Sequence, residues 1–168
     1  IAKGAMGNKE YSRAYELFIT VPAYQDADAQ AKECLYLPAL DAIRAGNYDE
    51  ALALLARLPE DYKDTAAQIK EINYRKAARL MNDKDYENAY AAFSALVPYS
   101  DSSRKAQEAL YALAQEALDS KGYLTAAGYL EKLAGYKDAD DLLLDARYQA
   151  ALSYLQEGST QDALALLD

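Results

Sequence analysis

An acidic residue and a tyrosine recur as a pair, three positions apart, at four places in this sequence. The pairs are Glu33 with Tyr36, Glu71 with Tyr74, Glu108 with Tyr111, and Asp145 with Tyr148. Residues three apart share one face of a helix, so each pair would present a carboxylate beside a phenol. Such a face could bind a basic peptide or one that contacts tyrosine. The alternative is that the amphipathic tyrosine rings pack inside the fold and the acids are solvated.

Most residue types that enzymes use are missing. The chain has no histidine, which excludes an imidazole base, a Ser–His pair and a histidine metal ligand. Cys34 is its one cysteine, too few for a thiolate zinc site, and a buried core position is expected for it. The sequence contains no glycine-rich phosphate-binding loop. The composition therefore predicts a protein that is not an enzyme, with no cofactor and no metal.

Two short acidic segments have some features of a cation site. Segment 83–87 alternates acids like the start of a calcium loop, but the glycine of the sixth place is missing and Ser94 stands at the twelfth. Asp138, Asp140 and Asp141 suit the start of a helix, whose free amides attract negative charge. We expect a solvated turn and a helix start at these two segments.

The net charge of −9 bears on the class of partner. A nucleic-acid surface needs clustered Lys and Arg, so the charge argues against DNA or RNA. It also disfavours docking on anionic lipid. No apolar run approaches the roughly 20 residues that cross a bilayer, so no membrane insertion is expected. The expected partner is a protein or peptide, with a basic peptide as one candidate.

The elements that would position these residues repeat every 37 or 38 positions. The start of each repeat is marked by Tyr11, Tyr48, Tyr86, Tyr123 and Thr160. Three positions later stands an alanine: Ala14, Ala51, Ala89, Ala126 and Ala163. Seven positions later stands a large apolar residue: Phe18, Leu55, Phe93, Leu130 and Leu167. Ten positions later stands another apolar residue: Val21, Leu58, Leu96 and Leu133. This spacing draws an apolar stripe along one short helix of about three turns in each repeat.

A second, longer helix is expected to follow in each repeat. Proline or glycine ends the short helix, and a Tyr-x-Asp motif precedes the long one, at 24–26, 62–64, 99–101 and 136–138. We expect the aspartate to cap the long helix by accepting hydrogen bonds from its free amides. Each acid–tyrosine pair lies within a long helix, and three residues after its tyrosine stands another alanine: Ala39, Ala77, Ala114 and Ala151. Alanine suits places where two helices approach closely.

The repeat predicts an all-α fold with ten helical segments in a single domain, residues 1–168. Ala2, Ala5 and Met6 are in register with the second half of a long helix, and the sequence stops within a short one. We therefore expect a section of a longer array, cropped at both ends.

Segment 46–52, Gly-Asn-Tyr-Asp-Glu-Ala-Leu, resembles the middle of a tetratricopeptide repeat. In that family a turn with Gly-Asn/Asp-Tyr opens a helix and a small residue follows. The match extends to Leu55, Leu58 and Ala39, and equivalent residues recur over essentially the whole chain. The period of about 37 exceeds the usual 34, and Tyr-x-Asp replaces the usual Asp-Pro between repeats. This variant looks like a divergent bacterial subfamily.

The resemblance implies a right-handed superhelix of antiparallel helix pairs, an α-solenoid. It also implies a non-catalytic scaffold that binds proteins or peptides, with the acid–tyrosine pairs near the concave, ligand-facing side. The alternatives are a structural spacer, or the regulatory arm of a larger bacterial protein with or without a membrane anchor. A soluble domain is expected, in the bacterial cytoplasm or in the extracytoplasmic part of an anchored protein.

Overall fold

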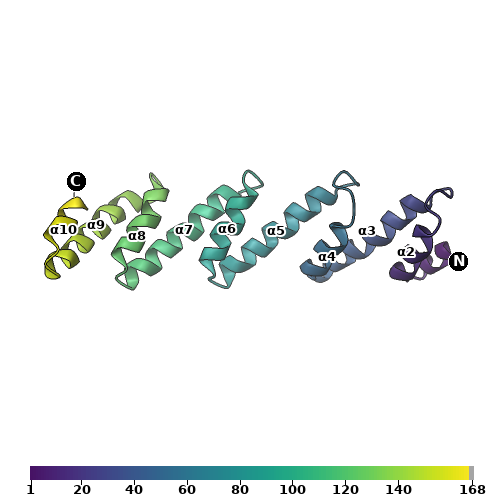
Figure 1. Ribbon diagram of the computed structural model, residues 1–168, viewed down its shortest axis with the longest axis horizontal. Coiled ribbons are helices and arrows are strands. Elements are labelled where there is room, and N and C mark those ends of the chain that lie inside the picture. The colour runs from purple at the N-terminus through teal and green to yellow at the C-terminus, as the bar shows by residue number, and fades with distance from the viewer. Residues whose placement is uncertain (167–168) are drawn as a thin grey trace. The chain divides into compact units, whose positions relative to one another are not determined.

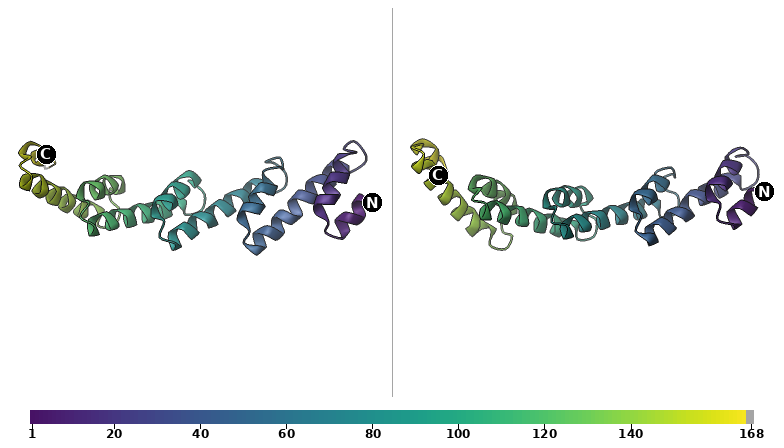
Figure 2. Two further views of the ribbon diagram at one scale, coloured as in Figure 1. Left: turned by 60° about the horizontal axis from the view of Figure 1, so that its bottom comes forward. Right: turned by 90° about the horizontal axis from the view of Figure 1, so that it is seen from below.

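The computed structural model describes residues 1–166, and over that range the chain forms ten α-helices, one 3₁₀ turn and no strand. Figures 1 and 2 show short coils alternating with long ones. The predicted all-α fold is confirmed. Within the same range, none of the helices is both long enough and apolar enough to cross a bilayer.

The helices begin where the sequence predicts. The short helices start at the residue that marks each repeat: α2 (Tyr11–Ile19), α4 (Tyr48–Leu55), α6 (Tyr86–Leu96), α8 (Tyr123–Leu130) and α10 (Thr160–Ala165). The long helices start directly after each Tyr-x-Asp motif: α3 (Ala27–Ala45), α5 (Thr65–Asn82), α7 (Ser102–Asp119) and α9 (Ala139–Gln156). The chain opens with α1 (Ala2–Gly7), and the 3₁₀ turn η1 (Glu131–Leu133) follows α8.

The chain divides into two compact units, and each has its own packing. The first unit comprises residues 1–76 and the second begins at Ala77, so the boundary falls inside α5. In the first unit α1 packs on α2, α2 on α3, and α3 on α4. In the second unit α6 packs on α7, α7 on α8, α8 on α9, and α9 on α10. Contacts between neighbours in the chain therefore hold each unit together.

The two repeated alanine positions are almost fully buried. In the short helices the exposed fraction is 0 % for four of these alanines and 2 % for Ala163. In the long helices it is 0 % for Ala39, Ala77 and Ala114 and 2 % for Ala151. No space remains for a larger side chain at such a position, and forcing one in typically costs about 1–3 kcal/mol. The repeat of alanine is thus a packing requirement of the fold.

The apolar stripe of the short helices forms the other half of the core. Leu55, Phe93 and Leu130 are fully buried and Phe18 nearly so. Leu167, the last member of this set, lies outside the described residues. Burying such a side chain contributes about 1.5–3 kcal/mol relative to leaving it in water. The predicted stripe is therefore confirmed at its third and seventh positions where the structure describes them. At the tenth position Leu58 and Leu133 are buried and Leu96 is half-buried, but Val21 is 48 % exposed, so the prediction was wrong for Val21.

The turn from each long helix to the next short one has the same backbone geometry in every repeat. The residue at its centre adopts a left-handed conformation: Lys9, Gly46, Lys84, Lys121 and Gly158 have φ between 59° and 80°. In each case the following amide donates to the carbonyl five residues earlier, as from Asn47 to Ala42 at 2.9 Å. This is the Schellman arrangement, which satisfies carbonyls left free at a helix end. Three lysines here adopt a conformation that favours glycine.

The Tyr-x-Asp turns also share one geometry, and they correct the expected capping. Asp26, Asp101 and Asp138 do occupy the N-cap position, but within the described residues their carboxylates accept no bond from helix amides. The backbone explains the difference, because φ near −100° and ψ of 16–25° at these aspartates depart from the extended conformation of a capping residue. The prediction was correct for the position of these residues and wrong for their bonding.

Candidate functional site

The tyrosines of the acid–tyrosine pairs differ in exposure. Tyr36 in α3 and Tyr111 in α7 are buried, with exposed fractions of 7 % and 9 %. Tyr74 in α5 is half-buried, whereas Tyr148 in α9 is 52 % exposed. The four positions are therefore not one uniform tyrosine surface.

In the first unit, Tyr36 is the centre of a cluster made by the following Tyr-x-Asp turn. The Tyr36 hydroxyl donates to Asp64, and its ring makes an edge contact with Tyr62 at 5.8 Å between centroids. Lys63 lies over the Tyr36 ring at 4.6 Å and forms an ion pair with Glu33. The Tyr62 hydroxyl donates to the same carboxylate at 2.9 Å. We call these five residues the first tyrosine cluster.

The second unit repeats this arrangement around Tyr111. Its hydroxyl donates to Asp138 Oδ1 at 2.6 Å, and its ring meets Tyr136 at 5.8 Å between centroids. Lys137 Nζ lies 4.2 Å from the centroid of the Tyr111 ring, a cation–π distance. We call Tyr111, Tyr136, Lys137 and Asp138 the second tyrosine cluster; Glu108, the counterpart of Glu33, instead pairs with Arg104 and Lys105 of its own helix. Both clusters tie a long helix to the turn that precedes the next one, so the Tyr-x-Asp motif has a structural role.

The electrostatics of the clusters follow from these contacts. Burial, together with the bond to Asp64, raises the pKa of Tyr36 to about 12. Burial and the Glu33 carboxylate likewise raise the pKa of Tyr62. The bond donated by the Tyr36 hydroxyl in turn lowers the pKa of Asp64. Both tyrosines are therefore neutral donors and Asp64 is an ionised acceptor at neutral pH.

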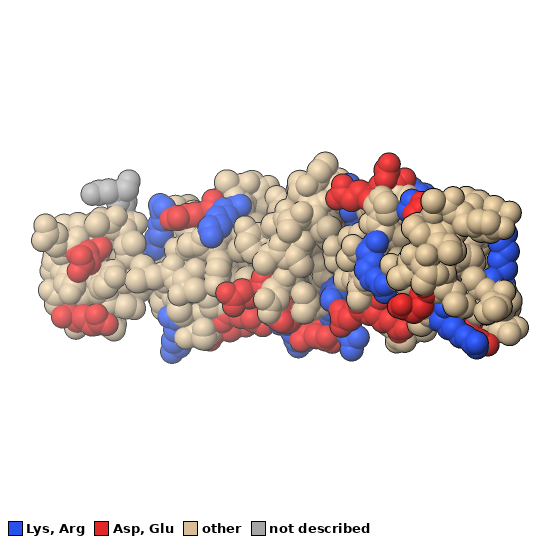
Figure 3. Space-filling view, turned by 45° about the vertical axis from the view of Figure 1, so that its right-hand side comes forward, with Lys and Arg blue, Asp and Glu red and all other residues tan. Residues whose placement is uncertain are grey.

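The acids of the pairs are mostly engaged by cations of the chain itself. Glu33 pairs with Lys63, Glu71 with Arg75, and Glu108 with Lys105 and Arg104. Asp145 is exposed. Figure 3 shows basic and acidic side chains next to one another over the face in view. A basic ligand would have to compete with these internal cations at three of the four positions.

The structure therefore joins Glu33 to the following Tyr-x-Asp turn, through Tyr62 and Lys63. Glu108 pairs with Arg104 and Lys105 of its own helix instead. Asp145 and Tyr148 are exposed, so theirs is the acid–tyrosine pair with the most surface for a ligand. Whether any of these residues contacts a partner stays a prediction.

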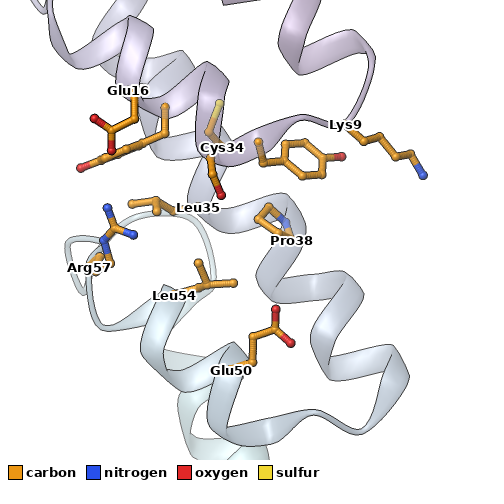
Figure 4. A pocket seen from close by; sticks show the side chains of 11 residues that line it. Lys9, Glu16, Cys34, Leu35, Pro38, Glu50, Leu54 and Arg57 are labelled. Carbon is orange, nitrogen blue, oxygen red and sulfur yellow. The ribbon is translucent and has the colours of Figure 1, made fainter.

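A groove between α2 and α4, with α3 as its floor, is a second candidate site. It encloses about 390 Å³. Eleven residues line it: Lys9, Tyr11, Ser12, Tyr15, Glu16, Cys34, Leu35, Pro38, Glu50, Leu54 and Arg57. Figure 4 shows the Leu35, Pro38 and Leu54 side chains near its middle, with Lys9 and Arg57 at opposite ends. An apolar centre with charged ends suits an extended peptide better than a small polar ligand.

The floor of the groove carries a backbone irregularity. Pro38 lies inside α3 and has no N–H to donate to the carbonyl of Cys34, one turn earlier. Both residues line the groove, and Cys34 is 2 % exposed, as expected from its register. Burial, with a smaller effect of Glu33, raises the pKa of its thiol, so the sulfur is a neutral apolar surface rather than a nucleophile.

A cation–π contact joins the two walls of the groove. The guanidinium of Arg57 lies 4.6 Å from the ring centroid of Tyr15 in α2. This contact joins the end of α4 to α2 across the groove. It leaves the N–H groups of Arg57 available at the groove end, where a carboxylate or backbone carbonyl could accept from them.

The second unit has a groove at the equivalent place, with a different lining. It lies between α8 and α10 and is lined by Leu124, Ala127, Gly128, Glu131, Arg147, Ala165 and Leu166. Arg147 takes the place that Leu35 has in the first groove and pairs with Glu131 at 2.9 Å. The repeat thus builds similar grooves whose chemistry differs between units.

Sequence reasoning missed the groove because most of its lining residues, Tyr11 apart, do not repeat. Its lining comes from three helices and varies between repeats, so no periodic signal marks it. The lysines of the clusters were also missed, although Lys63 and Lys137 stand at the central place of two Tyr-x-Asp motifs. This shared position within a repeated motif is the sequence signal that could have identified the two lysines.

Comparison with known proteins adds no family assignment. No protein-family model matches the sequence, and no curated protein is significantly similar to it.

Proposed function

We propose that this chain is a non-catalytic scaffold of the tetratricopeptide type, which binds a protein or peptide in the groove between α2 and α4. The proposal includes the right-handed solenoid of helix pairs that the sequence resemblance implies. It is supported by the regular alternation of short and long helices, by the buried alanines and by the recurring Schellman turns.

The observation that carries the proposal is the contrast between repeated and non-repeated residues. The repeated alanines, apolar stripe and tyrosine clusters are mainly used for packing. The lining of the groove between α2 and α4 differs from that between α8 and α10. Selective binding requires a surface whose side chains differ from repeat to repeat, while the packing residues beneath it stay the same.

The groove chemistry indicates the kind of ligand. Leu35, Pro38 and Leu54 offer apolar surface near the middle, which fits an apolar side chain of a peptide. The Tyr15 ring beside Arg57 adds aromatic surface toward one end. Lys9 and Arg57 at the ends can donate hydrogen bonds to backbone carbonyls or carboxylates of a ligand, while Glu16 and Glu50 can accept hydrogen bonds from it. A peptide with an apolar anchor and polar flanks is therefore the proposed ligand.

A peptide selection tests the proposal. Peptides displayed on phage would be selected on the wild-type chain, and their affinities measured for two variants. Ser12→Arg puts a long charged side chain on the groove wall from an exposed position, whereas Ser103→Arg places the same change on the exposed start of α7. We expect Ser12→Arg to weaken binding at least about tenfold, equivalent to about 1.4 kcal/mol, and Ser103→Arg to leave it unchanged. Equal affinities in all three proteins would place the binding site elsewhere. If the selection yielded no binding peptide, the result would favour a structural spacer.

A further inference from the structure

Arg57, just beyond the end of α4, differs from the other six arginines of the chain. Each of the others forms an ion pair with an acidic side chain: Arg13, Arg44, Arg75, Arg79, Arg104 and Arg147. Arg57 forms no ion pair with any residue that the structure describes, although the chain contains 27 acidic residues. Its guanidinium therefore has N–H groups that no internal carboxylate uses.

The fold holds this guanidinium at a defined place. It lies 4.6 Å from the centroid of the Tyr15 ring, a cation–π distance. Tyr15 is half-buried and packs against two core clusters, so its ring is a fixed support. A group that is already positioned loses less conformational entropy when a ligand binds. Arg57 is thus prepared to donate hydrogen bonds at its end of the groove, where Figure 4 shows it.

The packing of the repeats does not require an arginine at this position. The residues in register with Arg57 are Thr20, Ala95 and Lys132. Arg57 itself is exposed, so it does not fill the core. Arginine is also one of the residue types that most often dominate the binding energy of an interface. An exposed arginine that the framework does not need, beside a groove, is therefore suited to recognise a ligand.

The charges around the groove limit the kind of anion that can bind there. The lining contains two cations, Lys9 and Arg57, and two acids, Glu16 and Glu50, so its formal charge is zero. The whole chain has a net charge of −9, which would repel a strongly acidic ligand. A single carboxylate in an otherwise neutral peptide avoids most of that repulsion. Its two oxygens also match the planar fork of a guanidinium.

We propose that Arg57 binds the side-chain carboxylate of an aspartate or glutamate in a peptide that occupies the groove. This inference rests on the proposed function and narrows its ligand to a peptide with one acidic residue on the Arg57 side of its apolar anchor. The guanidinium donates a pair of hydrogen bonds to the carboxylate, while Leu35, Pro38 and Leu54 contact the anchor. The two contacts together fix the direction in which the peptide runs along the groove.

A double-mutant cycle between peptide and protein tests the proposal. The peptides are those selected on the wild-type chain, synthesised with amidated C-termini so that side chains supply every carboxylate. In each peptide, one acidic residue at a time is changed to its amide, aspartate to asparagine or glutamate to glutamine. We expect one such change to weaken binding to wild type at least about tenfold, equivalent to about 1.4 kcal/mol, and to have no effect on binding to Arg57→Gln.

Two further variants separate this bond from other effects of the arginine. Arg13→Gln removes the same charge from α2, outside the groove lining, and should discriminate the acidic peptide from its amide as wild type does. Arg57→Lys keeps the charge but loses the paired N–H groups, so it should retain only part of the tenfold difference. Circular dichroism should show wild-type helix content for all three variants, because the substituted residues are exposed.

The outcomes distinguish this inference from the proposed function. Suppose that Ser12→Arg weakens binding, but that the acidic peptide and its amide bind wild type equally well or differ as much on Arg57→Gln. The inference is then overturned, while the groove is still the binding site. Loss of the discrimination in Arg13→Gln would also overturn it, because attraction between distant charges would then explain the preference. If Ser12→Arg leaves binding unchanged, or no peptide is selected, the proposed function fails and this inference fails with it.

Discussion

The hydroxyl of Tyr111 offers a direct test of the structural role of the tyrosine clusters. Tyr111→Phe keeps the buried ring, its edge contact with Tyr136 and the Lys137 contact, and removes the bond to Asp138 at 2.6 Å. A hydrogen bond to a charged acceptor contributes about 1.5–3 kcal/mol. Because Asp138 is exposed, water can replace part of the hydrogen bond that its carboxylate loses in the variant. The expected decrease in the free energy of unfolding is therefore about 1–2 kcal/mol.

Thermal unfolding followed by circular dichroism measures this loss. For a chain of this size, about 1–2 kcal/mol lowers the midpoint by about 2–8 °C. The matched control is Tyr148→Phe, at the same register on α9, where the ring is exposed and the change should stay within about 0.5 kcal/mol. Equal losses of stability at the two positions would show that the bond to Asp138 does not hold the buried tyrosine.

The pH dependence of the same pair of proteins provides a second readout. The bond to Asp138, with burial, raises the pKa of Tyr111 above its ordinary value near 10. The folded state then holds the phenol proton more tightly than the unfolded state does. Its contribution to stability is complete below about pH 10 and is lost as the pH rises through the raised value. The difference in the free energy of unfolding between wild type and Tyr111→Phe should therefore shrink above pH 10. A difference that stays constant would contradict a raised pKa of Tyr111 in the folded state.

Three further changes test other parts of the structure. Lys84→Gly should raise stability by about 0.5–1 kcal/mol in urea unfolding, because φ of 61° strains a lysine; destabilisation would contradict the turn geometry. Ala114→Leu should lower stability by about 1–3 kcal/mol through overpacking, while Leu at exposed Gln107 should change it by less than about 0.5 kcal/mol. The double change Glu71→Gln with Glu108→Gln should leave the affinity of groove-binding peptides unchanged in a fluorescence titration; weaker, salt-sensitive binding would instead assign the ligand to the acid–tyrosine pairs.

Much of the helical framework could be predicted because its signals are local and repeated. Tyr48 marks a helix start, Ala51 a close contact and Leu55 a buried stripe, and each recurs at one period. Periodicity of this kind reports which side of a helix is buried, and burial dictates the residue type. The helix starts and buried alanines were therefore correct along the described chain.

The turns and the site were harder to predict because they depend on backbone angles and on residues distant in sequence. A lysine gives no sign of a left-handed conformation, and only its register with Gly46 and Gly158 indicates the turn at Lys84. The side-chain bonding of Asp138 depends on its own φ and ψ, which composition does not reveal. The bond from the Tyr62 hydroxyl to Glu33 joins residues 29 positions apart, and no local pattern reveals it.

We propose that the ligand binds in the groove between α2 and α4, and not along the acid–tyrosine pairs. Methyl NMR of the chain, titrated with a peptide selected on it, tests this most directly. We expect the largest shift changes at Leu35 and Leu54 in the groove, with the methyl signals of Leu110, beside Tyr111, unchanged. Shift changes centred on Leu110 in α7, with Leu35 and Leu54 unaffected, would contradict it.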